Sequence, residues 1–160
     1  ETPVGFKHIG ALMESEPIIF GGEESGGLSI GNHIPEKDGV LACLLMAELV
    51  ATEGKSLGKI LKVIEKQTGP FYTDRINIDV PNEKKSAILK KLQNGFKNIG
   101  NFPVQKFIRT DGYKFLLPND EWICFRASGT EPVIRCYLEA KSMPNLRHLK
   151  SASQKLLLIK

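Results

Sequence analysis

The stretch Arg126–Pro132, with the sequence Arg-Ala-Ser-Gly-Thr-Glu-Pro, joins two runs that are predicted to be strands, Glu121–Phe125 and Val133–Ala140. A loop of this composition can direct backbone N–H groups, two hydroxyls and a guanidinium into one concave space. Such a loop is suited to holding a phosphate. An ordinary hairpin connection is the alternative, because Gly, Ser and Thr are common turn residues.

The second half of the chain is predicted to be a small α+β domain. Its expected core is an antiparallel four-stranded sheet covered by helices. Alternating apolar and polar residues indicate the strand Arg75–Val80, and the Asp-Gly pair at Asp111 indicates a hairpin between Gln105–Arg109 and Tyr113–Leu117. A final helix is expected from about Pro144.

The first half is predicted to be mostly helical, a remnant of an α/β domain with one short buried strand over Pro17–Phe20. Helices are expected over Phe6–Met13, over 38–52 with Asp38 as the N-cap, and from Ser56 onward. The second of these is apolar on nearly all sides, which is typical of a buried helix. Gly69-Pro70 marks the predicted boundary, which divides the chain into domains 1–69 and 70–160.

Composition excludes several classes of protein. Hydrophobic residues make up 41% of the 160 residues, which is enough for a packed core. The formal net charge is +4, and the 22 basic residues are interspersed with 18 acidic ones, so no basic block indicates nucleic acid. No run approaches the ~20 apolar residues of a membrane span. We therefore expect neither a nucleic acid nor a membrane as a partner.

The three cysteines, Cys43, Cys124 and Cys136, have no metal-ligand spacing, and an odd number gives no disulfide framework. A simple hairpin centred on Thr130 would place Cys124 beside Cys136. Reduced, buried thiols are the favoured state, which fits a cytoplasmic protein. We expect no metal site in this chain.

A second loop, Gly21–Gly27, has the sequence Gly-Gly-Glu-Glu-Ser-Gly-Gly. The carboxylates of Glu23 and Glu24 can each accept hydrogen bonds from sugar hydroxyls, Ser25 adds a hydroxyl, and glycines allow a ring to come close. A polar surface turn is the alternative. No periodicity in this region predicts a helix or a strand.

Two charged residues outside these loops, Arg135 and Lys37, are further candidates, although Arg135 could also be a solvent-facing strand residue. Arg126 and Arg135 bracket the Ser-Gly-Thr turn, so both could converge on one anion. Lys37 precedes a helix and could reach a phosphate or a reacting hydroxyl, or it could simply be solvated. His33 is interpreted as a structural hydrogen-bonding residue. No residue is placed to be an activated nucleophile.

The two loops together resemble the α-D-phosphohexomutase family, the phosphoglucomutases and phosphomannomutases. The segments Thr2–Lys7 and His33–Gly39 are also similar to family segments and lie in the right order. Family members have four domains around a central cleft. The resemblance implies that this chain corresponds to the end of the third domain and to the fourth domain, with the missing N-terminal domains of the same protein as its partners.

The resemblance also implies roles for residues. Glu23, Ser25, Lys37 and, with a looser match, Lys7 would bind the sugar and the reacting groups, and Lys37 is a candidate acid or base. The phosphate would be held by residues of the opening loop and by a neighbouring arginine: Arg126, Ser128, Gly129, Thr130 and Arg135. The implied substrate is a hexose phosphate. Gly27 replaces a histidine that is frequent in mannose-accepting members, which favours glucose.

The family's phosphoserine loop (Thr-x-Ser-His-Asn-Pro) and magnesium loop (Asp-Gly-Asp-x-Asp-Arg) are not in this sequence. The resemblance implies that Mg²⁺ binds outside this chain, that hexose 1,6-bisphosphate is the intermediate, and that the chain alone is inactive. The competing hypothesis is a non-catalytic module that binds sugar phosphates or nucleic acid.

Overall fold

The computed structural model describes residues 1–129 and 131–157, apart from the side chain of Asn82. The chain divides into two compact units, unit 1 over Glu1–Gln67 and unit 2 over Thr68–Lys160. None of the helices among the described residues has the length and the apolar character that crossing a membrane requires.

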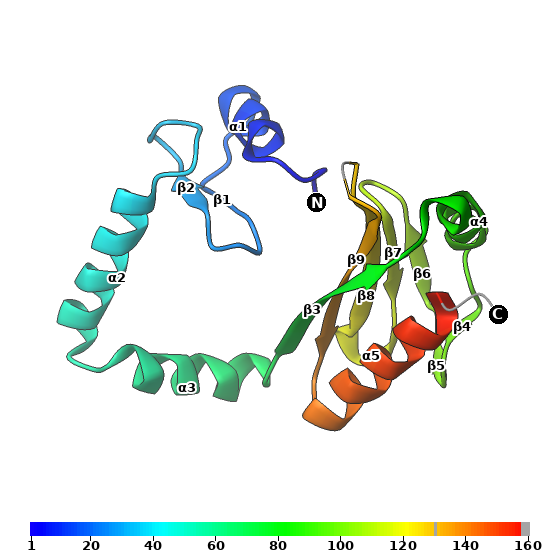
Figure 1. Cartoon of the computed structure of the whole chain (residues 1–160). Coiled ribbons are helices and arrows are strands. Elements are labelled where there is room, and N and C mark those ends of the chain that lie inside the picture. Colours follow the sequence, from blue (N-terminus) through cyan, green and yellow to red (C-terminus); the bar gives the residue numbers. More distant parts are fainter. Residues whose placement is uncertain (130, 158–160) are drawn as a thin grey trace. The chain divides into compact units, whose positions relative to one another are not determined.

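Unit 1 contains three helices and one hairpin (Figure 1). The elements are α1 (Phe6–Ser15), β1 (Phe20–Gly22), β2 (Leu28–Ile30), α2 (Gly39–Glu53) and α3 (Leu57–Thr68). The glycine-rich segment, which was predicted to be loop throughout, supplies part of β1 and all of β2, and these strands pair antiparallel with Gly21 opposite Ser29. Glu23–Gly27 forms the turn of this hairpin.

Helix α1 packs closely against the hairpin and the loop that follows it. A side chain at Gly21 would meet the Ile9 side chain, and one at Gly10 would meet the carbonyl oxygen of Pro35. These two positions therefore need glycine because of close approach. The expected burial of the Pro17–Phe20 run is wrong in this chain, because Ile19 is 85% exposed and strand β1 begins only at Phe20.

The apolar helix α2 was predicted to be buried in something larger than this chain, and within the described residues it is largely exposed. The helix has its predicted N-cap at Asp38 and ends at Gly54 in the left-handed conformation, but none of its residues is buried. Val40 and Leu44 are 71% and 62% exposed. Within unit 1, α2 packs against β2, and the described residues leave much of its apolar surface uncovered.

Unit 2 is built on one antiparallel sheet, with strand order β3-β9-β8-β7-β6. The sheet strands are β3 (Tyr72–Asp79), β6 (Lys106–Ile108), β7 (Tyr113–Leu116), β8 (Trp122–Ala127) and β9 (Val133–Ala140). The α+β class is as predicted, but the sheet has five strands instead of four, because both arms of the predicted Asp-Gly hairpin join it. The remaining elements are α4 (Asn82–Gln93), the short pair β4 (Asn98–Ile99) and β5 (Phe102–Pro103), a 3-10 turn at Pro118–Asp120, and α5 (Met143–Leu157).

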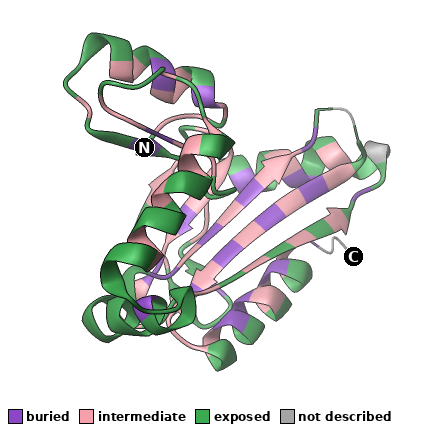
Figure 2. Ribbon diagram, turned by 90° about the vertical axis from the view of Figure 1, so that its left-hand side faces the viewer, coloured by how far each residue is buried: buried purple, intermediate pink, exposed green. Residues whose placement is uncertain are grey.

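The core of unit 2 lies between one face of the sheet and helices α4 and α5. Buried and partly exposed residues alternate along β9, and partly exposed and exposed residues alternate along β3 (Figure 2). This period of two is what a sheet with one covered face requires. The covered face carries Phe115, Phe125, Ile134 and Leu138, which are almost fully buried and pack with Leu149 of α5.

The register of β8 and β9 corrects the expectation for the cysteines. Cys124 lies opposite Tyr137, and Cys136 lies opposite Phe125, so the two thiols are on opposite faces of the sheet. The amide of Ser128 donates to the carbonyl of Val133, which centres the hairpin between residues 130 and 131 and not on Thr130. A shift of one residue exchanges the faces of a strand. Cys136 is consequently buried, and burial raises the pKa of its thiol from the ordinary 9.0 to about 12.

Candidate functional site

The hairpin turn of unit 1 gathers three of the residues predicted to bind the sugar. The amide of Glu23 donates to the carbonyl of Gly27 (2.8 Å), and the amide of Gly26 donates back to the carbonyl of Glu23 (3.0 Å). The Oε2 atom of Glu23 lies 3.4 Å from Lys37 Nζ and 3.5 Å from Ser25 Oγ. The structure thus brings Glu23, Ser25 and Lys37 together.

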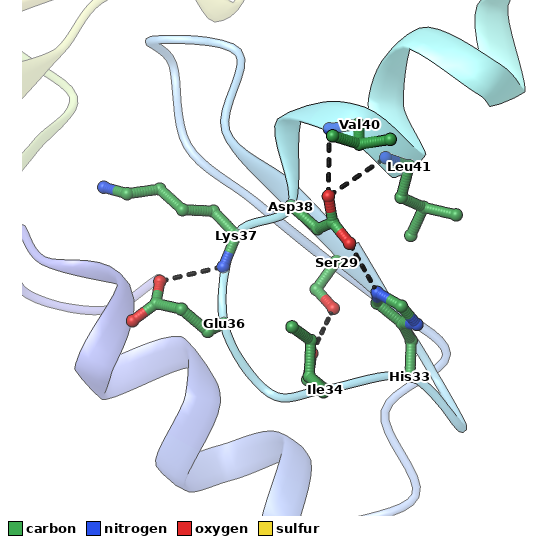
Figure 3. A network of polar contacts seen from close by, with 8 residues as sticks. All are labelled: Ser29, His33, Ile34, Glu36, Lys37, Asp38, Val40 and Leu41. Atoms are coloured by element: carbon green, nitrogen blue, oxygen red, sulfur yellow. Dashed lines mark hydrogen bonds and ion pairs between the residues drawn. The ribbon is translucent and has the colours of Figure 1, made fainter.

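Lys37 is held in place by the backbone around it (Figure 3). The hydroxyl of Ser29 donates to the carbonyl of Ile34 (2.6 Å), and the amide of Asp38 donates to the carbonyl of Leu28 (3.2 Å). These two hydrogen bonds tie the loop to strand β2. The Lys37 amide donates to Oε1 of Glu36 (2.8 Å), while its side chain remains more than half exposed.

Asp38 closes this loop and begins helix α2. Its Oδ1 accepts hydrogen bonds from the amides of Val40 (2.9 Å) and Leu41 (3.0 Å), and its Oδ2 lies 2.9 Å from His33 Nε2. The hydrogen bond from the Leu41 amide, followed by that with His33, lowers the pKa of the Asp38 carboxyl. The prediction that His33 is a structural hydrogen-bonding residue is confirmed.

Lys7 is not brought to this group. It lies exposed in the first turn of α1. Among the described residues, no hydrogen bond or ion pair joins Lys7 to Glu23, Ser25 or Lys37.

The candidate phosphate site of unit 2 centres on two arginines. Arg126 of β8 and Arg135 of β9 are directly opposite each other in the sheet, on the face that α4 and α5 leave uncovered. The Nε atom of Arg126 lies 3.2 Å from Asp111 Oδ2, and Arg135 Nη2 lies 2.9 Å from Glu131 Oε2. The Nε atom of Arg135 is buried and has no hydrogen-bond partner among the described residues.

The loop between these strands is folded around Ser128. This serine is only 4% exposed, and its Oγ accepts a hydrogen bond from the amide of Glu131 (3.1 Å). In this structure the Ser128 hydroxyl therefore shapes the loop. Gly129 is exposed next to the tip, and the predicted phosphate ligand Thr130 lies outside the described residues.

Sequence reasoning missed two residues that contact this site. Asp111 was recognised only as part of an Asp-Gly turn, yet its carboxylate pairs with Arg126 beside an open pocket of about 470 Å³ that Arg109 and Tyr113 also line. Lys85 of α4 donates from Nζ to the carbonyls of Ser128 (2.7 Å) and Glu131 (3.1 Å). No local sequence signal links Lys85 to the loop, because 43 residues separate it from Ser128.

No group of three or more His, Cys, Asp or Glu side chains among the residues that the structure describes could hold a metal ion.

Comparison with known proteins identifies the family. The family model "Phosphoglucomutase/phosphomannomutase, alpha/beta/alpha domain III" matches residues 1–67, and "Phosphoglucomutase/phosphomannomutase, C-terminal domain" matches residues 76–154. The chain belongs to the phosphoglucomutase/phosphomannomutase family, and the resemblance seen in the sequence is confirmed.

Individual relatives agree with this assignment. A "Probable phosphoglucosamine mutase" of Methanosphaera stadtmanae is 30% identical over 98% of this chain and 33% of its own length. A "Phosphoglucomutase/phosphomannomutase" of Thermococcus kodakarensis is 31% identical over 92% of this chain and 30% of its own length. The chain thus spans about a third of the length of these curated relatives.

Solved structures give the same fold. A crystal structure described as a putative phosphomannomutase from Thermus Thermophilus is 33% identical, with a TM-score of 0.74 over 98% of this chain and 30% of that chain. A family protein from Burkholderia thailandensis has a TM-score of 0.71 at 18% identity over 98% of this chain and 31% of that chain, which supports the fold alone.

Proposed function

We propose that this chain is the substrate-binding portion of a phosphohexomutase that interconverts hexose 1-phosphate and hexose 6-phosphate. The observation that carries the proposal is the pair of opposed arginines, Arg126 and Arg135, at the base of a Ser-Gly-Thr loop. Like charges placed directly opposite each other on a sheet repel, and Asp111 and Glu131 each offset one of the two. The buried Nε of Arg135 still has no partner among the described residues, and each guanidinium keeps further donors, which a phosphate dianion can bind in a bidentate manner.

In this proposal the two units have different tasks. Glu23, Ser25 and Lys37 of unit 1 hold hydroxyls of the sugar, and Lys7 adds a charge from α1. The Glu23 carboxylate accepts hydrogen bonds from hydroxyls, and Lys37 donates to an oxygen or exchanges a proton with it. In unit 2, Arg126, Arg135 and the loop residues Ser128, Gly129 and Thr130 hold the phosphate.

The phosphoryl transfer itself is assigned to parts of the protein outside this sequence. We propose a phosphoserine enzyme, a hexose 1,6-bisphosphate intermediate and a Mg²⁺ ion that offsets charge on the phosphates, none of which this chain supplies. The chain alone is accordingly proposed to bind without turnover, and the missing N-terminal domains are its proposed partners. The reduced thiols expected from the sequence fit a cytoplasmic enzyme.

Glucose is the hexose that we propose first. Gly27 leaves no side chain beside Glu23 and Lys37. The family resemblance implies that mannose-accepting members often have a histidine at this position. Glucosamine phosphate is the second candidate, since several relatives carry the name phosphoglucosamine mutase. Steady-state kinetics of the complete protein with glucose, mannose and glucosamine 1-phosphates will rank the three by kcat/KM.

The proposal is tested by Arg126→Ala in the complete protein. Loss of a charge-assisted hydrogen bond costs about 1.5–3 kcal/mol, so we expect KM for the hexose phosphate to rise about 10- to 100-fold. The thermal midpoint is expected to change little. Arg147→Ala, at an exposed position of α5, is the matched control and leaves KM unchanged. A large loss of thermal stability with an unchanged KM refutes the proposal.

The alternative, a non-catalytic binding module, would use the uncovered face of the sheet. On that face, cationic side chains already lie over two aromatic rings. Lys114 Nζ lies 4.6 Å from the centroid of the Trp122 ring, and the guanidinium carbon of Arg75 lies 5.9 Å from the centroid of the Tyr137 ring. Single-stranded nucleic acid binds by stacking bases on aromatic rings that are free to receive them. This arrangement favours the hexose-phosphate proposal over a nucleic-acid module.

A further inference from the structure

We propose that Lys85 is a positioning residue, which orients the peptide bond between Ser128 and Gly129 so that its N–H can bind an anion. This inference rests on the proposed function of that loop. Lys85 touches no candidate ligand side chain of the phosphate. It donates to the carbonyl oxygens of Ser128 and Glu131, at 2.7 and 3.1 Å.

The hydrogen bond from Lys85 to the Ser128 carbonyl also fixes the orientation of the peptide bond between Ser128 and Gly129. No peptide bond among the described residues is cis, and in a trans peptide the C=O and the N–H point in opposite directions. When Lys85 fixes the Ser128 carbonyl toward α4, it fixes the Gly129 N–H away from α4. Gly129 is exposed, and among the described residues its N–H has no hydrogen-bond partner. That N–H is therefore available to an anion.

Two further carbonyls of the loop, those of Glu131 and Pro132, also accept hydrogen bonds. The Glu131 carbonyl is the second acceptor of Lys85, and the Pro132 carbonyl accepts from the amide of Val80 (2.8 Å). The carbonyl oxygens of Ser128, Glu131 and Pro132 thus all have donors. A carbonyl oxygen facing a phosphate would repel it, so fixing these oxygens elsewhere favours anion binding.

The position of Lys85 on α4 points to the same role. Ile88 and Leu92, three and seven residues later, are buried against the sheet, so Lys85 belongs to the sheet-facing side of the helix. It is half-buried, whereas its neighbour Lys84 is exposed. A lysine near a helix N-terminus is unfavourable with respect to the helix dipole. The contact with the loop offsets that cost.

The test uses the complete protein with Lys85→Met, which keeps the length of the side chain and removes its donors. We expect KM for hexose phosphate to rise about 3- to 10-fold with kcat little changed, since the variant weakens a binding site and not the chemistry. Lys84→Met is the matched control and is expected to leave both constants unchanged. Lys85→Arg, which restores a charged donor, is expected to recover most of the lost affinity.

A cycle with Arg126→Ala separates this inference from the proposed function. If both residues serve one anion site, the double variant loses less affinity than the two single losses combined. An unchanged KM in Arg126→Ala overturns the proposed function itself. A raised KM in Arg126→Ala together with an unchanged KM in Lys85→Met overturns only the role of Lys85. If Lys85→Met lowers the thermal midpoint, the KM of the folded Lys85→Arg variant decides: a value near that of the unmodified protein supports the inference, and an equal loss contradicts it.

Discussion

Arg126 and Arg135 occupy opposed positions on the adjacent strands β8 and β9, and each forms an ion pair with a carboxylate. Nε of Arg126 donates a hydrogen bond to the Asp111 carboxylate, and Nη2 of Arg135 donates one to the Glu131 carboxylate. Each guanidinium has five N–H donors in a fixed fork, so these contacts leave donors that a phosphate can use. The strand register therefore sets two cations side by side before any ligand binds.

The unit 1 site predicts that Gly27→Ala impairs sugar binding. A methyl group at Gly27 would lie 3.0 Å from Cδ of Lys37 and 3.3 Å from Oε2 of Glu23, so it would push these side chains apart. Because one net hydrogen bond contributes about 1 kcal/mol, we expect KM of the complete protein to rise about 5-fold. The control is Gly58→Ala on α3, where the added methyl group meets nothing within 4 Å. Equal KM values for the two variants would contradict the site.

The N-cap of α2 predicts a specific response to acid. The pKa of Asp38 is lowered in the folded protein by the amide of Leu41 and by His33. Its contribution to stability is therefore fully present above the unfolded pKa, about 3.9, and is lost as the pH falls through the lower folded pKa. Urea unfolding of the chain between about pH 6 and about pH 2.5 measures this loss.

The matched variant for this acid response is Asp38→Asn, because asparagine is also a good N-cap but does not titrate. We expect the variant to lose less stability than the unmodified chain over the same pH interval. Parallel losses in the two proteins would show that the Asp38 carboxylate does not carry the effect.

The register of β8 and β9 predicts the reactivity of the thiols. Because burial raises the pKa of Cys136 to about 12, its thiol stays protonated near neutral pH, and the thiolate is the reactive form. Cys43 is exposed. We expect iodoacetamide to alkylate Cys43 first in the native chain and Cys136 only in denaturant, as measured by peptide mass spectrometry. Native alkylation of Cys136 at the rate of Cys43 would contradict the register.

The same thiol predicts an alkaline loss of stability. The folded pKa is above the unfolded value of about 9.0, so the contribution of Cys136 is present below pH 9 and is lost as the pH rises toward 12. Cys136→Ser removes this thiol while changing little volume. Its unfolding free energy is expected to be less dependent on pH across that interval, and an unchanged dependence would contradict the assignment.

Local patterns predicted much of the fold. The alternation along Val133–Ala140 is a short-range signal that predicted strand β9. The Asp-Gly pair at Asp111 is another, and it predicted the antiparallel pairing of β6 with β7. Asp38 was recognised as an N-cap for the same reason. The two-strand hairpin around Glu23 was missed because Gly21, Gly22 and the residues after them have weak strand propensity.

What the sequence could not predict is the geometry of the β8–β9 turn and one contact between distant residues. The offset of the β8–β9 register follows from the Ser128–Val133 hydrogen bond, and composition does not reveal it. The hydrogen bond from the Glu131 amide to Ser128 Oγ is local to the turn, whereas the contact of Lys85 with Ser128 joins residues that are 43 positions apart. The sequence identified the candidate ligand residues by their chemical type, but only the structure shows how their side chains are oriented.

The most direct measurement is a titration of this chain with glucose 1-phosphate, followed by the NMR signal of the Gly129 amide. We expect a saturable shift at Gly129 with glucose 1-phosphate, no shift with glucose, and no shift with glucose 1-phosphate in Arg126→Ala. A single-stranded oligonucleotide is the competing ligand and is expected not to bind. Saturable binding of the oligonucleotide, together with no response of Gly129 to glucose 1-phosphate, would contradict a hexose-phosphate site at Arg126 and Gly129.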